Sequence, residues 1–311
     1  MSLKPYRSME PFTEQDYKAF VAKTRHVMID GVPIKLAEPQ STRAFGPPSD
    51  YRLEDSTVWS FPNRGDWATH TGEYRGNWSP YIPRNLILRY TKPGELVLDQ
   101  MMGSGTTLVE CKLLSRESVG VDINPAAVVL ARDRLNFSLP PRGAGDATPT
   151  CEVKTYIGDA RNLDLVRDDS VDLVATHPPY AGIVAYSRGA VEGDLSDLSI
   201  DEYVKEMRVV AEEAYRVLKP GRRCAILIGD TRRRLHYVPI SVRVMEAFLD
   251  VGFALKEDIV KLQWHMKTTR ERWRGRVYDF YKIAHEHLYI FTKTSSKTEA
   301  SNLKYSLKWW P

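Results

Sequence analysis

The sequence predicts an α/β fold: a doubly wound, mainly parallel, Rossmann-like sheet of seven strands with an antiparallel last strand. From about residue 84 onward, short apolar strands alternate with helices of ordinary length, which is the pattern of parallel α/β sheets. The last two predicted strands have no strong helical segment between them. That absence favours an antiparallel pair at the end of the sheet.

Local signals place each element of this alternation. Asn124 and Pro125 begin one helix as its N-cap and first-turn proline. Pro220 and Gly221 end the longest helix, and Gly252 ends the helix after it. The predicted strands are 96–98, 119–122, 153–157, 171–175, 224–228, 255–262 and 287–292, and the predicted helices are 107–114, 124–135, 200–218 and 239–251.

The first 65 residues or so are less regular. They predict a short helix over 13–23, capped by Thr13, and a strand–turn–strand unit over 26–36. We therefore divide the chain into an N-terminal extension (1–65), a main domain (66–295) and a C-terminal tail (296–311).

Composition excludes membrane-spanning and disulfide-rich classes of protein. The chain has 311 residues, 42% of them hydrophobic, but no run of about 18 apolar residues and no secretory signal at its start. Its three cysteines lie far apart without metal-ligand spacing, so we expect neither a metal site nor a disulfide scaffold. These features predict a cytoplasmic protein.

Three successive predicted strands each end in an acidic residue: Asp99, Asp122 and Asp159. Ligands of such sheets bind at the carboxyl ends of strands, where Asp122 can accept from ribose hydroxyls and Asp159 from an adenine amino group. Gly103 and Gly105 let the backbone pass close to a ligand. The turn has neither the third glycine of a dinucleotide fingerprint nor the lysine of a P-loop. A ligand without phosphate needs neither feature.

The fourth predicted strand is followed by His177, Pro178, Pro179 and Tyr180. The two prolines fix a rigid, extended turn. An exocyclic amine of a nucleic-acid base is a poor nucleophile because its lone pair is delocalised into the ring, and two acceptors aimed at its hydrogens would free that lone pair. We expect the side chain of His177 and the carbonyl oxygen of Pro178 to be these acceptors. Tyr180 offers a face on which an extruded base can stack.

These motifs together resemble the amino-methyltransferase family of DNA modification enzymes, which act on cytosine N4 or adenine N6. Segments 99–107, 177–180, 75–86 and 284–293 are similar to the family's cofactor motif, its catalytic [Ser/Asp/Asn]-Pro-Pro-aromatic motif, the segment beside the methionine end of its cofactor, and its final strand. The resemblance implies a methyltransferase sheet, S-adenosylmethionine as cofactor, and catalysis by residues 177–180. The cofactor-binding residues that it implies are Asp99, Gly103, Ser104, Gly105, Thr106, Asp122, Ile123, Asp159, Ala160 and Trp78.

His177 departs from the family pattern, which has Ser, Asp or Asn at this place. A neutral imidazole can still accept one hydrogen bond through one ring nitrogen, so the role survives above its unperturbed pKa of about 6.5. In the family, Ser at this position is usually associated with cytosine and Asp or Asn with adenine. The histidine leaves the base open, and its neutral character favours cytosine N4, with adenine N6 as the alternative.

Double-stranded DNA, with base flipping, is the expected partner. The main domain has no room for a separate recognition domain, so recognition falls to 1–65, to the 182–197 loop or to the basic segment 261–282. That segment interleaves cations with Trp264 and other aromatics, which suits phosphate contacts and base stacking. The predicted DNA-binding residues are Lys267, Arg270, Arg272, Arg274, Arg276, Arg232 and Arg233.

Two alternative functions stay open at this point. The same chemistry serves RNA amino groups, although no KH or RRM motif is visible in the sequence. A non-catalytic nucleic-acid-binding protein on a degenerate methyltransferase fold would explain His177, but the other motif residues are intact. The sequence also leaves open a homodimer, a role of 1–65 in forming it, and a restriction endonuclease partner.

Overall fold

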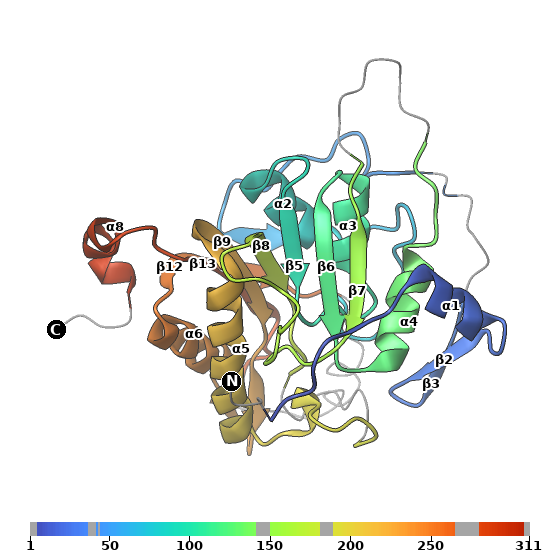
Figure 1. Ribbon diagram of the computed structural model, residues 1–311. Coiled ribbons are helices and arrows are strands. Elements are labelled where there is room, and N and C mark those ends of the chain that lie inside the picture. The colour runs from blue at the N-terminus through green and yellow to red at the C-terminus, as the bar shows by residue number, and fades with distance from the viewer. Residues whose placement is uncertain are drawn as a thin grey trace.

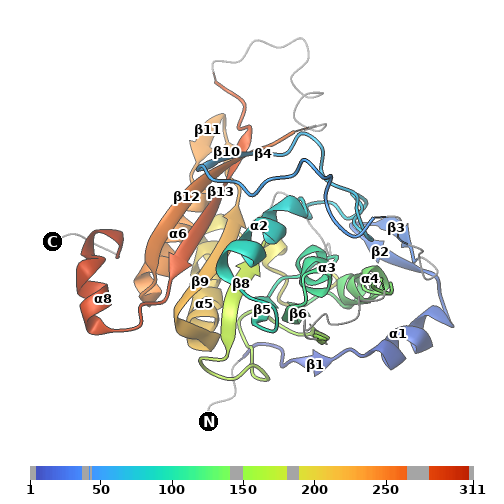
Figure 2. The ribbon, with the colours of Figure 1, turned by 90° about the horizontal axis from the view of Figure 1, so that it is seen from above.

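A mixed sheet forms the centre of the computed structural model, which describes residues 5–36, 42, 44–140, 150–180, 189–264 and 280–307. The strand order is β1-β7-β6-β5-β8-β9-β13-β12-β4 (Figures 1 and 2). These strands are β1 (Glu10–Pro11), β4 (Val58–Ser60), β5 (Leu96–Asp99), β6 (Glu117–Asp122), β7 (Val153–Ile157), β8 (Val171–Thr176), β9 (Leu218–Ile228), β12 (Ala254–Leu262) and β13 (His285–Thr292).

Seven of these strands are the predicted ones, and the predicted fold class is confirmed. Strands β7, β6, β5, β8 and β9 run parallel to one another. Strand β13 is antiparallel to both β9 and β12. Two short strands that the sequence did not predict extend the edges: β1 pairs with β7, and β4 pairs with β12.

Helices cover both faces of the sheet (Figures 1 and 2). Alternate residues of one strand face opposite layers, as strand geometry requires. The helices are α2 (Tyr81–Tyr90), α3 (Thr106–Leu113), α4 (Pro125–Arg134), α5 (Ile200–Val217) and α6 (Ile240–Val251). Leu98 packs in the cluster with α5 and α6, whereas its neighbour Val97 packs in the cluster with α2 and α3.

Most helix ends follow the predicted signals. The side chain of Asn124 accepts a hydrogen bond from the Ala126 backbone N–H at 3.0 Å, and Pro125 is the first residue of α4. Helix α5 begins with a capping box between Ser199 and Glu202. These caps satisfy backbone N–H groups that have no partner inside the helix.

Strand β9 begins earlier than predicted. Helix α5 ends near the predicted stop, but the strand starts at Leu218 instead of residue 224. Its pairing with β8 shifts register near its start, so an extra stretch of β9 stands outside the ladder. Lys219 in that stretch donates to Asp172 at 2.8 Å, which fixes the bulge against β8.

The N-terminal region packs onto the main sheet and α4. Helix α1 (Glu14–Val21) and strands β2 (His26–Ile29) and β3 (Val32–Lys35) lie where the sequence predicts them. Thr13 is the N-cap of α1. Apolar side chains of α1, β2 and β3 share one cluster with α4. The division at residues 65 and 295 stays a prediction.

The hairpin that follows β9 and the helix that follows β13 lie at opposite ends of the strands of the sheet. The hairpin of β10 (Thr231–Arg233) and β11 (His236–Val238) follows the carboxyl end of β9. Helix α8 (Lys297–Asn302) follows β13, whose carboxyl end pairs with the start of β9. Two short 3-10 helices are η1 (Leu195–Asp197) and η2 (Lys304–Ser306). Within the ranges that the structure describes, no helix combines the length and the apolarity needed to cross a membrane.

Candidate functional site

A pocket lies at the carboxyl ends of β5, β6, β7 and β8, on the edge of the sheet where the predicted motifs meet. The predicted site residues that line it are Trp78, Asp99, Gly103, Thr106, Asp122, Ile123, Asp159, Ala160, His177 and Pro179. The structure thus brings residues of both motifs to one cavity. Their roles in binding and catalysis stay predictions.

Some predicted site residues lie beside the pocket instead of on its wall: Ser104, Gly105, Pro178 and Tyr180. Gly105 has φ +78°, and a Cβ added there would lie 3.0 Å from the Cβ of Ala131. Glycine at this position therefore allows the left-handed backbone at the start of α3 and the close packing of α3 on α4. The hydroxyl of Ser104 accepts from Asn77 Nδ2 at 3.3 Å, which ties the turn to a residue of the pocket wall.

Asp99 connects three elements beneath the pocket. Its Oδ2 accepts from the Thr107 hydroxyl of α3 at 2.5 Å, and its Oδ1 accepts from the Thr176 hydroxyl of β8 at 3.0 Å. Burial raises the pKa of Asp99 to about 6, although these hydrogen bonds oppose the rise. The Asp99 side chain thus fixes the position of the 99–107 motif relative to the strand that leads into the 177–180 motif.

Asp122 holds the glycine turn against the next strand. Its two oxygens accept from the Gly103 N–H at 2.8 Å and from the Asn124 N–H at 2.9 Å. Burial raises the pKa of Asp122 to about 7, and the nearby charge of Asp194 adds to the rise. Its carboxyl group therefore changes charge close to neutral pH.

Asp159 is bound by an arginine that the sequence analysis did not single out. Arg161 Nε donates to Asp159 Oδ1 at 2.8 Å, and Arg161 Nη2 donates to Asp159 Oδ2 at 2.6 Å. The Nη2 group also donates to the carbonyl oxygen of Gly193 at 2.8 Å. This hydrogen bond holds the 193–195 segment in place as one wall of the pocket. Asp159 thereby positions this wall as well as facing the cavity.

Asp194 is a pocket residue that the sequence analysis missed. It is 7% exposed and lines the cavity beside Gly193 and Leu195. Its Oδ1 accepts from the Ser196 N–H at 2.9 Å, so in sequence it looks like the cap of a short 3-10 helix. Other lining residues missed include Tyr74, Asn77, Gln100 and Met102. An acidic residue inside a predicted loop is too common to have marked this one.

The pocket fits a cationic nucleoside such as S-adenosylmethionine. The carboxylates of Asp122, Asp159 and Asp194 suit ribose hydroxyls, an adenine amino group and a sulfonium charge. None of the described lining residues is Lys or Arg, so a phosphate would meet no cationic side chain on this wall. A Cβ added to Gly193 would lie 3.0 Å from Ile123 Cδ1, so the glycine keeps this wall close to the cavity.

His177 sits between Trp78 and Tyr180 at the end of β8. Its ring stacks on Trp78 with centroids 5.8 Å apart and planes inclined by 21°. Burial lowers the pKa of His177 to about 4; Glu286 opposes this, whereas Lys261 and Arg64 reinforce it. The imidazole is therefore neutral throughout the physiological pH range, as the predicted acceptor role requires.

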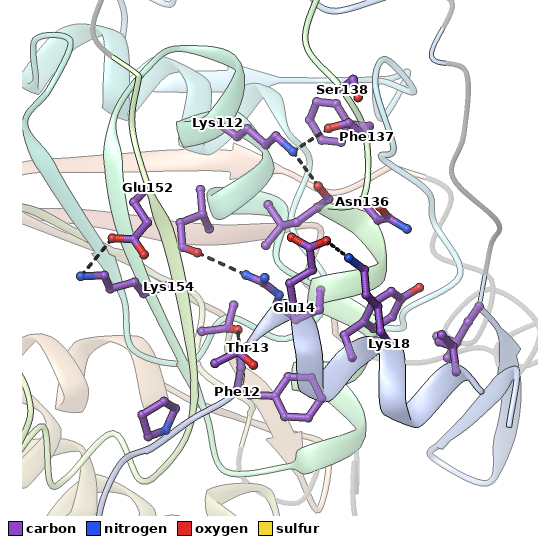
Figure 3. Close-up of a pocket in the computed structure, with 18 of the residues that line it drawn as sticks. Phe12, Thr13, Glu14, Lys18, Lys112, Asn136, Phe137, Ser138, Glu152 and Lys154 are labelled. Atoms are coloured by element: carbon purple, nitrogen blue, oxygen red, sulfur yellow. Dashed lines mark hydrogen bonds and ion pairs between the residues drawn. The ribbon is translucent and has the colours of Figure 1, made fainter. Parts of the chain in front are cut away.

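A second, larger hollow lies between α1, α4 and β7 (Figure 3), with a volume of about 1340 Å³. Its cations are held by neighbouring groups: Lys112 donates to two backbone carbonyl oxygens, and Lys18 and Lys154 pair with Glu14 and Glu152. None of the predicted catalytic or cofactor residues lines it. The predicted catalytic and cofactor-binding residues lie instead at the smaller, acid-lined pocket.

The predicted DNA-binding residues fall into two groups. Lys267, Arg270, Arg272, Arg274 and Arg276 lie outside the described residues. Arg232 lies in β10, where its guanidinium donates to the carbonyl oxygens of Leu235 and Tyr281 and covers the ring of Phe280. Its neighbour Arg233 is exposed. Of the two described cations, Arg233 is the one that presents its charge to solvent.

A model of a DNA methylase family, the N6/N4 methyltransferases, matches residues 15–133 and 171–310, which is most of the chain. The type II methyltransferase M.BglII of Bacillus subtilis is 30% identical over 45% of this chain and 35% of its own length. M.SmaI of Serratia marcescens is 34% identical over 29% of this chain and 30% of its own length. The chain thus spans about a third of the length of these curated relatives.

A SAM-dependent methyltransferase structure from Methanosarcina mazei aligns with 68% of this chain and 98% of its own, at a TM-score of 0.44 and 17% identity. The methyl donor of the matched family is S-adenosylmethionine, so that prediction is confirmed, whereas the residues that bind it stay predictions. By the extent of the match, this chain belongs to the N6/N4 DNA methylase family.

Proposed function

We propose that this protein transfers a methyl group from S-adenosylmethionine to an exocyclic amino group of a base in double-stranded DNA. The observation that carries the proposal is the place of His177: a neutral acceptor on the wall of an acid-lined pocket. A neutral acceptor favours attack by an amine, and the acidic wall favours a cationic methyl donor. The family supplies the substrate class.

The residues of this protein activate the amine, and the cofactor is the source of the methyl group. S-adenosylmethionine, when bound, supplies an electrophilic methyl group. His177 and the carbonyl oxygen of Pro178 accept hydrogen bonds from the two amino hydrogens, which frees the nitrogen lone pair. The nitrogen gains the methyl group and loses one proton, and His177 is placed to take that proton. Tyr180 stacks on the flipped base.

We propose cytosine N4 as the target atom, because the acceptor at position 177 is uncharged. Nucleosides from treated duplex DNA, tRNA and rRNA can be separated by mass spectrometry after incubation with the cofactor. N4-methyldeoxycytidine is the expected product. N6-methyldeoxyadenosine would overturn the choice of base, and product confined to RNA would overturn the choice of DNA. No product together with no saturable cofactor binding in calorimetry would indicate a degenerate, non-catalytic fold.

Cofactor affinity is expected to fall below pH 7 because of Asp122. An ionised carboxylate accepts the ribose hydroxyls, and its pKa of about 7 in the free protein means that acid protonates it. Binding therefore favours the deprotonated form, and the Kd should rise roughly tenfold per pH unit well below the pKa. Calorimetry at pH 5.5, 6.5 and 7.5 measures this. The Asp122→Asn variant should bind the cofactor weakly and with little pH dependence. An equally steep change of its Kd with pH would show that a group other than Asp122 is responsible.

DNA affinity is expected to depend on Arg233, which lies exposed in the hairpin that follows the carboxyl end of β9. Removing a phosphate-binding cation by Arg233→Ala should weaken binding to every sequence alike and reduce the slope of log K against log salt by about one. Fluorescence anisotropy at several salt concentrations measures both effects. Lys297→Ala is the matched control, since Lys297 is exposed on α8 at the opposite end of the strands from the hairpin. Equal losses of DNA affinity in both variants would show that the hairpin is not part of the DNA-binding surface.

A further inference from the structure

A chain of hydrogen bonds leads from β12 through β13 to the catalytic motif. Lys261 Nζ donates to Glu286 Oε2 at 2.8 Å. The hydroxyl of Tyr180 donates to Glu286 Oε1 at 2.6 Å, and the same hydroxyl lies 2.8 Å from His177 Nε2. The pairing of β13 with β9 brings Glu286 to the carboxyl edge of the sheet, although it lies 106 residues from Tyr180 in sequence.

The charge of Lys261 sets which group donates and which accepts in each hydrogen bond of this chain. Lys261 is an ammonium with donors alone, and an ionised carboxylate has acceptors alone, so Glu286 must accept from both neighbours. The single hydroxyl proton of Tyr180 is thereby committed to Glu286. The tyrosine oxygen can then only accept from His177, which requires a proton on Nε2.

We infer that Glu286, held by Lys261, acts through Tyr180 to fix the Nε2–H tautomer of His177 and so leaves Nδ1 as the acceptor for the amino group. The inference rests on the proposed function, because it names which atom of His177 meets the substrate. Among the described residues, Nδ1 has no hydrogen-bond partner. Glu286 and Lys261 are thus positioning residues that let a histidine replace the Ser, Asp or Asn of the family pattern.

Burial and charge keep the chain in this state. Glu286 is 6% exposed; burial favours its neutral form, but Lys261 outweighs that effect and lowers the pKa of Glu286 to about 2. The charged groups that act on His177 are Glu286 on β13, Lys261 on β12 and Arg64 before α2, and with burial they leave the ring uncharged. Neither Glu286 nor His177 therefore changes charge near neutral pH.

The test is Glu286→Gln, which keeps the shape of the side chain and reverses the direction of the hydrogen bonds between residue 286, Tyr180 and His177. Lys261 can only donate, so it takes the amide oxygen, and the amide NH2 turns to Tyr180. The tyrosine hydroxyl then donates to His177 Nε2, and the ring proton moves to Nδ1, where the substrate needs an acceptor. We expect kcat to fall about 100-fold, with the KM for DNA and the Kd for S-adenosylmethionine changed less than threefold.

A double-mutant cycle separates this effect from a structural one. A serine at position 177 has no tautomer, and its hydroxyl can rotate to suit either direction of the chain. In the His177→Ser background, Glu286→Gln should change kcat less than threefold. A loss of similar size in both backgrounds would overturn the inference, because a merely structural role of Glu286 does not depend on residue 177.

Nitrogen-15 NMR of the histidine ring gives a readout that needs no activity. The wild-type protein should show a pyrrole-like shift for His177 Nε2 and a pyridine-like shift for Nδ1, and Glu286→Gln should exchange them. The signals are assigned by their loss in His177→Ser. A protonated Nδ1 in the wild type would overturn the inference. If the wild type methylates no nucleic acid but shows the expected tautomer, the proposed function fails and the hydrogen-bond chain stands.

Discussion

Replacing His177 by phenylalanine is expected to lower kcat about 1000-fold while cofactor affinity changes less than fivefold. Phenylalanine preserves the stacking on Trp78, whose ring lies 5.8 Å away, and removes only the ring nitrogens. The amine then loses one of its two acceptors and the base that takes its proton, and general-base catalysis is worth about 10²–10⁴-fold. Single-turnover methyl transfer to duplex DNA measures the rate, and calorimetry measures the affinity.

The asparagine variant is the matched control for this result. Asn at position 177 can donate from its amide to the Tyr180 oxygen and still present a carbonyl acceptor, so His177→Asn should keep far more activity than His177→Phe. With saturating cofactor, the wild-type kcat should be flat from pH 8 to about 5.5, because His177 protonates only near pH 4. Equal activities of the two variants would show that position 177 offers no acceptor to the substrate.

The strands and the acids at their ends can be predicted from sequence because both are local features. A short apolar run marks each central strand, and the topology of parallel sheets places their carboxyl ends together. Asp99, Asp122 and Asp159 therefore meet at one pocket, as the pattern predicts. The tautomer of His177 could not be predicted, since Glu286 reaches Tyr180 only through the pairing of distant strands.

Helix α2 shows where local signals mislead. It has no side-chain cap at its start, and Pro83 lies in its first turn, so its sequence looks like a loop. Proline costs no helical hydrogen bond at that place, because the first N–H groups of a helix have no partner within it. Ile82, Leu86 and Ile87 are almost fully buried beneath the sheet, and this tertiary packing stabilises the helix.

The same region depends on one buried carboxylate. Glu110 of α3 is fully buried and accepts from Trp67 Nε1 at 2.6 Å, from His70 Nε2 at 2.8 Å and from Arg84 Nη1 at 2.8 Å. These residues flank the segment that carries Trp78 to the pocket. Three donors from one stretch of chain therefore converge on a single side chain of the cofactor-binding half.

We expect Glu110→Ala to lower the free energy of unfolding by about 3–5 kcal/mol, because it leaves the Arg84 charge and two ring N–H groups buried without their partner. At the usual entropy of unfolding per residue, this corresponds to a fall in Tm of roughly 5–8 °C. Thermal unfolding followed by circular dichroism measures it. The loosened 67–84 segment should also weaken cofactor binding at temperatures where the variant is still folded.

The surface variant Glu212→Ala controls for the loss of a glutamate. Glu212 pairs with Arg208 on the exposed face of α5, with about half of its side chain in solvent, so its loss should cost less than about 1 kcal/mol. The double variant Glu110→Gln with Arg84→Met removes the charged pair and keeps a carbonyl acceptor for Trp67 and His70. It should recover part of the stability, since most of the penalty in Glu110→Ala comes from the unpaired guanidinium. Stability of the double variant no higher than that of Glu110→Ala would instead place the cost in the lost contacts with Trp67 and His70.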